Sequence, residues 1–291
     1  MAKYFNRFKY NDNAMTFAQH HFYKYHGLGN DFILFEGSEH FSPEEVIALC
    51  DRHRGIGADG VLFITQRNSL PYMRVINSDG SIPEMCGNGI RCAAFHIRRT
   101  ETIADAVFQI DTDAGIHEVK VKIQSPTEAE VQVQMQTPSF EASAILLSQP
   151  NKLIDQEFCI EQTPLKLTAV SMGNPHAVCF DDISKEQRIK LAPQIQNHEL
   201  FPKGANVGFA QVLAAQHLRL HVYERGAGWT QACGTGACAA AAAAVQTKRA
   251  DGNTSIQVDL PGGSLHIQTG KENSPTLMRG PAVLVFEGSS L

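Results

Sequence analysis

Short apolar runs separated by glycines and polar turns recur along the chain, and they predict strands. Residues 23–25 and 32–35 are strand-like runs set between glycines. Residues 116–123 and 129–135 alternate apolar and polar side chains, which is typical of half-buried antiparallel strands. Further strands are predicted at residues 61–65, 73–77, 168–171, 209–213 and 218–223.

Helices are predicted between these strands. Ser42 is a suitable N-cap, Pro43 suits the first helical position and two glutamates follow, so a helix is expected from residue 43 to about residue 52. Residues 90–97 have helical composition, a polar helix is expected at residues 184–197, and an alanine-rich helix is expected from Ala237. The chain therefore alternates short strands and helices.

The two halves of the chain repeat one plan. Cys86 and Cys233 lie in matching Cys-Gly-x-Gly turns, 147 residues apart, and each turn precedes a predicted helix. The same offset aligns Asn77 with Glu224 and residues 57–59 with residues 204–206, and a slightly shorter offset aligns Gly29-Asn30 with Gly173-Asn174. A duplication of this kind predicts two similar lobes with matching loops facing one small-molecule site.

Composition narrows the class of protein. With 43% hydrophobic and 19% charged residues, the chain resembles an ordinary globular protein. Its net charge of −5 gives no basic footprint for nucleic acid. The longest apolar run, residues 237–245, is far shorter than the roughly 20 residues that span a bilayer. Residues 1–20 lack the apolar core of a signal peptide, so a cytoplasmic protein is expected.

Seven cysteines are present, an odd number without any Cys-x-x-Cys pair. Reduced thiols are therefore expected in place of a disulfide framework, and no metal site is predicted. A lone cysteine is usually a small core residue. That interpretation applies to Cys50, Cys92, Cys159, Cys179 and Cys238.

Cys86 and Cys233 stand apart because their context is duplicated. Amides at a helix N-terminus can hold a carboxylate, and they lower a thiol pKa from about 8.5 into the range of roughly 3.5 to 7.5. Inverting a stereocentre without a cofactor requires one group that removes a proton and another that delivers one to the opposite face. The pair is predicted to be one thiolate and one thiol at rest, because two close thiolates would repel each other.

At these residues the chain resembles the diaminopimelate epimerase family. The matching motifs are residues 26–32 (HGLGNDF), 55–60 (GIGADG), 77–81 (NSDGS), 86–89 (CGNG), 173–176 (GNPH), 204–206 (GAN), 224–226 (ERG) and 233–236 (CGTG). One departure is Gly60, where family members often carry glutamine, and a pocket contact is expected to be absent or replaced there.

The resemblance implies an α+β fold of two pseudo-symmetric lobes, each a mixed, mainly antiparallel sheet curled around a central helix. The expected division is a first lobe of residues 21–135 plus 279–291, a second lobe of residues 136–278, and an N-terminal extension over residues 1–20. The resemblance also implies a homodimer and an activity that uses neither PLP nor a metal. The implied activity converts LL-2,6-diaminopimelate to its meso form for lysine and peptidoglycan synthesis, with Cys86 and Cys233 as base and acid.

The resemblance also implies roles for polar residues around the cysteines. His176 and Glu224 would tune the thiols, and Arg225 can grip a carboxylate with two hydrogen bonds. A lone asparagine beside glycine more often only forms a turn. The implied substrate-binding residues are Asn30, Asn77, Gly87, Asn88, Asn174, Asn206, Glu224, Arg225, Gly234 and Thr235.

Two other functions compete with this one. A proline or hydroxyproline racemase would keep the fold and the thiol pair, but a cyclic substrate has no distal charged group to match Glu224 and Arg225. A non-catalytic amino-acid binding protein or a thiol redox sensor would bind or titrate without exchanging a carbon-bound proton with solvent. Proton exchange therefore separates these functions.

Overall fold

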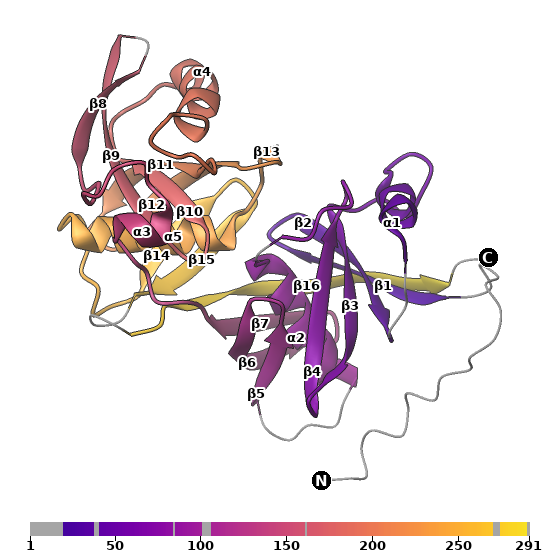
Figure 1. The fold of residues 1–291 in the computed structure, drawn as a ribbon. Coiled ribbons are helices and arrows are strands. Elements are labelled where there is room, and N and C mark those ends of the chain that lie inside the picture. The colour runs from indigo at the N-terminus through magenta and orange to yellow at the C-terminus, as the bar shows by residue number, and fades with distance from the viewer. Residues whose placement is uncertain are drawn as a thin grey trace.

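Two lobes joined by one long strand make up the molecule (Figure 1). The computed structural model describes residues 20–37, 41–83, 85–100, 106–160, 162–269 and 274–289. Apart from His20, the expected N-terminal extension lies outside the described residues, as do residues 290 and 291 of the expected first lobe. The predicted two-lobed α+β fold is confirmed.

The first lobe is a sheet that closes on itself around α2 (Gly87–Thr100). Strands β1 to β7 pair in chain order, and β16 (Leu277–Ser289) pairs with both β7 and β1. The seven strands are β1 (His21–Gly27), β2 (Asn30–Glu36), β3 (Gly60–Arg67), β4 (Leu70–Asn77), β5 (Val107–Thr112), β6 (Gly115–Ser125) and β7 (Glu128–Gln134). Helix α1 (Pro43–Cys50) lies outside this sheet (Figure 1).

The second lobe also curls around a central helix, α5 (Gly234–Gln246). Its strand order is β8-β9-β10-β11-β12-β14-β15-β16, with the short β13 on β12. The strands are β8 (Gln156–Ile160), β9 (Thr163–Ser171), β10 (Pro175–Cys179), β11 (Asn206–Ala214), β12 (His217–Glu224), β13 (Gly228–Trp229), β14 (Ile256–Leu260) and β15 (Gly263–Gln268), and the outer helices are α3 (Ala142–Ile145) and α4 (Lys185–Gln196).

Strand pairing repeats between the lobes, as the duplicated sequence predicts. The pairs β2–β3 and β10–β11 are parallel, whereas β3–β4 and β11–β12 are antiparallel. The pairs β4–β5 and β12–β14 are again both parallel. These strands therefore correspond between the lobes, and α2 and α5 occupy equivalent positions.

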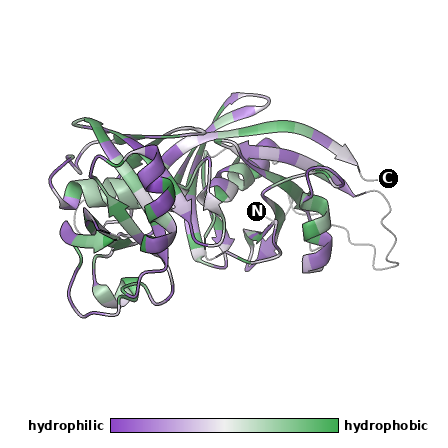
Figure 2. Cartoon of the chain, turned by 90° about the horizontal axis from the view of Figure 1, so that it is seen from above, coloured by the Kyte–Doolittle hydropathy of each residue, from purple (hydrophilic) through white to green (hydrophobic). Residues whose placement is uncertain are grey.

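Both central helices are buried because sheet surrounds them. Residues 237–244 of α5 are all buried, and alanine suits this position because it favours helix and lets strands approach closely. Buried and partly exposed residues alternate along most of β16, and Figure 2 shows hydrophobic residues along this joining strand. No helix in the described ranges is long and apolar enough to cross a bilayer.

Local signals placed the helices well, with shifted ends. Ser42 caps α1 through a complete capping box, but the helix ends at Cys50, two residues earlier than predicted. Helices α2 and α5 each begin three residues before the predicted start, at Gly87 and Gly234. The glycine turns predicted before these helices are thus part of their first turns.

Candidate active site

The N-termini of the two central helices meet at a pair of glycines. A β-carbon built on Gly87 would lie 3.4 Å from the α-carbon of Gly234, and one built on Gly234 would lie 3.3 Å from the α-carbon of Gly87. Both positions also face Met278 of β16, at 3.0 Å. Side chains here would force the helices apart, so glycine brings the two N-termini and their unpaired amides together.

Each cysteine caps its own helix with its thiol. Cys86 Sγ accepts a hydrogen bond from the amide of Gly89 at 3.3 Å, and Cys233 Sγ accepts one from the amide of Gly236 at 3.3 Å. A β-carbon on Gly89 or Gly236 would lie 3.1 Å from the capping sulfur. Both glycines of each Cys-Gly-x-Gly motif are therefore required by close contacts.

Glu224, at the end of β12, lies near both thiols. Burial and the charge of this carboxylate raise the pKa of the Cys233 thiol, and Thr230 Oγ1 donates a hydrogen bond to Glu224 Oε1 at 2.5 Å. The negative charge of Glu224 raises the pKa of Cys86 as well as that of Cys233. Because Coulomb interactions weaken with distance, one carboxylate acting on both thiols places them in a single site.

Burial opposes thiolate formation at both positions. Desolvation raises the pKa of Cys86 to about 11 and raises that of Cys233 well above its ordinary value. The amide of Gly89 lowers the pKa of Cys86, but by less than burial raises it. The helix amides therefore favour a thiolate but do not outweigh desolvation, and the resting pair of one thiolate and one thiol stays a prediction.

Asparagines of the first lobe reach across to the cysteine loop of the second. Asn88 Nδ2 donates to Asn30 Oδ1 at 2.9 Å and to the carbonyl of Ala232, directly before Cys233, at 2.9 Å. Asn30 in turn donates to Asp59 at 2.8 Å. The structure thus brings Asn30 and Asn88 together and ties them to the other lobe.

A second group of hydrogen-bonded polar residues, in the second lobe, lies at the ends of β10, β11 and β12. Asn206 Oδ1 accepts from the backbone amide of Arg225 at 2.9 Å, and its Nδ2 donates to the carbonyl of Pro175 at 3.2 Å. The side chains of His176 and Asn174 hydrogen-bond each other at 2.9 Å. Asn206 therefore fixes the turn that carries Arg225, because both ends of the Asn206 side-chain amide bond to backbone groups.

His176 is buried, and its ring is expected to be neutral at pH 7. Desolvation together with the nearby Arg225 lowers its pKa to about 3. Any effect of His176 on the thiols would therefore come without a charge on its ring, whereas the charge of Glu224 raises the pKa of both thiols.

Three predicted residues lie around these groups. Thr235, in the first turn of α5, is buried with its hydroxyl 3.6 Å from Cys233 Sγ. Asn77 donates to Ser81 Oγ at 3.0 Å within its own turn. Arg225 is exposed and donates to the carbonyl of Lys203 at 3.1 Å.

The neighbouring backbone explains why residue 60 is a glycine. A β-carbon at this position would lie 2.8 Å from the carbonyl oxygen of Ile76 in the neighbouring β4. The interpretation that a side-chain contact is absent or replaced here is therefore incomplete, because this backbone has no space for the side chain.

Sequence reasoning missed Arg91, Asp59 and Thr230 as parts of the site. Arg91 is a charged residue inside the otherwise apolar run of α2, and that contrast was a usable signal. The partners of Asp59 and Thr230 come from distant segments, so no local pattern marks them. Within the described ranges, no group of three or more His, Cys, Asp or Glu side chains is arranged to hold a metal ion.

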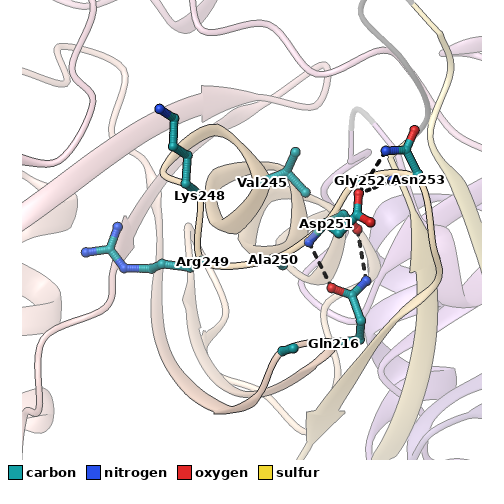
Figure 3. Close-up of a pocket in the computed structure, with 9 residues that line it drawn as sticks. Gln216, Val245, Lys248, Arg249, Ala250, Asp251, Gly252 and Asn253 are labelled. Atoms are coloured by element: carbon teal, nitrogen blue, oxygen red, sulfur yellow. Dashed lines mark hydrogen bonds between the residues drawn. The ribbon is translucent and has the colours of Figure 1, made fainter.

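A hollow at the opposite end of α5 has a structural explanation (Figure 3). Gln216 exchanges two hydrogen bonds with the backbone of Asp251, at 2.8 and 2.9 Å, and Asn253 donates to the Asp251 carboxylate at 2.9 Å. These polar groups close the turn after the helix. The hollow is about one helix length, roughly 20 Å, from Cys233.

Comparison with known proteins agrees with this arrangement. The family model of diaminopimelate epimerase matches residues 22–141 and 168–285. Relatives named diaminopimelate epimerase from Gloeothece citriformis and Synechocystis are 43% and 41% identical to the chain, each over 92% of it and over 97% and 98% of their own lengths.

Among solved structures, a probable proline racemase from Agrobacterium radiobacter has a TM-score of 0.67 at 14% identity, covering 94% of this chain and 93% of its own. This likeness concerns the fold alone. The family match spans both lobes and includes both cysteine motifs. The chain belongs to the diaminopimelate epimerase family.

Proposed function

We propose that the protein epimerises LL-2,6-diaminopimelate to meso-diaminopimelate without a cofactor, as its relatives' name implies, with Cys86 and Cys233 as acid and base. The observation that carries this proposal is the matched pair of thiols. Each caps one of two helices whose N-termini meet at Gly87 and Gly234. Amides from two helices around one point suit a carboxylate whose α-carbon lies between the thiols.

The proposed reaction moves one proton across one carbon. A thiolate takes the α-proton from one face, and the other cysteine donates its thiol proton to the opposite face. The charge that develops beside the substrate carboxylate is stabilised by the helix amides and by Asn88 and Thr235. The thiol and the thiolate have exchanged places after one turnover, and proton exchange with solvent restores them.

Recognition of the distal amino-acid group is proposed for the polar residues around the thiols. Arg225 would bind the distal carboxylate, with Asn206 holding its turn. Glu224 would contribute a negative charge toward the substrate as well as toward the thiols. The other proposed contacts come from Asn30, Asn77 and Asn174. A second lobe of residues 136–278, a homodimer and a cytoplasmic location complete the proposal and rest on family resemblance.

Incubation of the reduced protein with LL-diaminopimelate in heavy water tests this function. We expect deuterium at one α-carbon, together with formation of the meso isomer, measured by NMR and chiral chromatography. Exchange of proline or hydroxyproline in place of diaminopimelate would favour the racemase alternative. Binding without exchange of any carbon-bound proton would contradict an epimerase.

The pH dependence of activity should report on Glu224. Because its charge raises both thiol pKa values, kcat/KM should rise from neutral to alkaline pH, by up to tenfold per pH unit. Glu224→Gln removes that charge, which lowers both pKa values and shifts the rise to lower pH. An unshifted profile, measured over pH 6 to 10, would show that Glu224 does not control the thiols.

A further inference from the structure

Arg91 is a buried cation whose hydrogen-bond partners among the described residues are all neutral. Its side chain is 0% exposed, and it donates to the carbonyl of Gly87 at 3.0 Å, to Asn88 Oδ1 at 2.8 Å and to the carbonyl of Pro281 at 3.2 Å. In the described part of the chain, no carboxylate forms an ion pair with this guanidinium. Burying a charge in this way is costly, so a role beyond packing is indicated.

The fold provides space for this guanidinium. A β-carbon on Gly27 of β1 would lie 2.8 Å from Arg91 Nη2. Glycine at this position of β1 therefore leaves space for the guanidinium. Hydrogen bonds to Gly87, Asn88 and Pro281 fix its place.

The charge breaks the symmetry of the two lobes. The offset that aligns Cys86 with Cys233 aligns Arg91 with Cys238, which is neutral and buried in α5. The first lobe thus has a cation five residues after its cysteine, and the second lobe has none at the equivalent position. The charge of Glu224 raises the pKa of both thiols, whereas the charge of Arg91 lowers that of Cys86.

We propose that Arg91 is a positioning residue that orients the amide of Asn88 and favours the thiolate on Cys86 over the thiolate on Cys233. This inference rests on the proposed function of the thiol pair. Because Arg91 donates to Asn88 Oδ1, the Nδ2 of Asn88 must face Asn30 and Ala232.

The surroundings of Cys86 agree with this role. The guanidinium lowers the pKa of Cys86, against the effects of burial and of Glu224. Asp113 and Cys86 line the same small cavity, and Cys92 of α2 interacts electrostatically with Cys86. The positive charge of Arg91 opposes the effect of these groups on the Cys86 thiol, and a guanidinium remains charged at neutral pH.

Alkylation of the full-length protein by iodoacetamide tests the charge directly, since only the thiolate reacts. Rates at Cys86 and Cys233 are measured separately by peptide mass spectrometry from pH 6 to 10. For Arg91→Met we expect the Cys86 rate at pH 8 to fall about tenfold, equivalent to one pKa unit, with a much smaller change at Cys233. Arg98→Met, which removes a charge about 10 Å along the same helix, should leave both rates unchanged.

Two further variants separate the charge from the fold. Arg91→Gln provides a second neutral side chain if circular dichroism shows that Arg91→Met fails to fold. Arg91→Lys keeps the charge but loses the planar guanidinium, so the rate of Cys86 alkylation should be nearly normal. Because Asn88 loses its orientation, kcat should fall by a larger factor than KM changes.

An unchanged Cys86 profile in a folded neutral variant, or equal losses at Cys86 and Cys233, would overturn the inference. Alkylation needs no turnover. Its outcome is therefore independent of whether the heavy-water experiment supports the epimerase function.

Discussion

Replacing Cys86 or Cys233 by alanine is expected to reduce epimerisation of LL-diaminopimelate by about 10³-fold or more. Each thiol is proposed to carry one of the two proton transfers, and positioned acid–base groups contribute about 10² to 10⁴-fold each. Neither loss can be covered by the remaining thiol, because the two groups cap different helices and act from different sides. The loss should appear in kcat with little change in secondary structure.

Matched controls are available on the same helices. Cys92 in α2 and Cys238 in α5 are fully buried thiols, and Cys92→Ala and Cys238→Ala remove the same atom from the same helix. Both should retain epimerase activity. Proton exchange in heavy water should persist in one of the catalytic single mutants for one isomer, since one base remains. Substantial epimerisation by either catalytic mutant would refute the two-base mechanism.

Arg225→Lys is expected to lower kcat/KM by about 10-fold to 150-fold. A planar guanidinium can pair with both oxygens of a carboxylate, and an ammonium cannot. Charged hydrogen bonds contribute about 1.5 to 3 kcal/mol each, so losing one gives this range. Both KM and kcat should worsen, because the grip at the distal end helps place the α-carbon between the thiols.

Arg219→Lys is the matched control for this change. Arg219 lies on β12, which ends one residue before Arg225, and it donates to Gln211 at 3.4 Å. The substitution should leave the kinetics unaltered. If Arg225→Lys stays within about twofold of wild type in steady-state kinetics, Arg225 is not a substrate anchor, since a lost bidentate contact costs far more than that.

The sequence predicted those parts of the fold that depend on local signals. Ser42 and its capping box define the start of α1, and period-two alternation identifies β6 and β7. Strand β16 went unpredicted from the residue pattern because Gly280 and Pro281 interrupt it. Its extended form depends on pairing with β1, β7 and β15, which only the assembled fold provides.

The candidate site, too, could be predicted only where local sequence signals mark it. Residue types and spacing led to Cys86 and Cys233, but not to the contact of Asn88 with the carbonyl of Ala232, since a backbone atom of the other lobe has no sequence signature. The thiol pKa values were also beyond the sequence. They depend on how completely the lobes exclude water, and that is a property of packing.

The path of β16 has a consequence for synthesis of the protein. The first seven strands leave the ribosome early, yet among the described residues β1 and β7 are bridged by β16, which follows every strand of the second lobe. The N-terminal lobe therefore cannot close its sheet until residues 277–289 have been synthesised, and until then its strand edges stay open. Open strand edges can pair with other chains, so the first lobe depends on β16 for protection against aggregation as well as for stability.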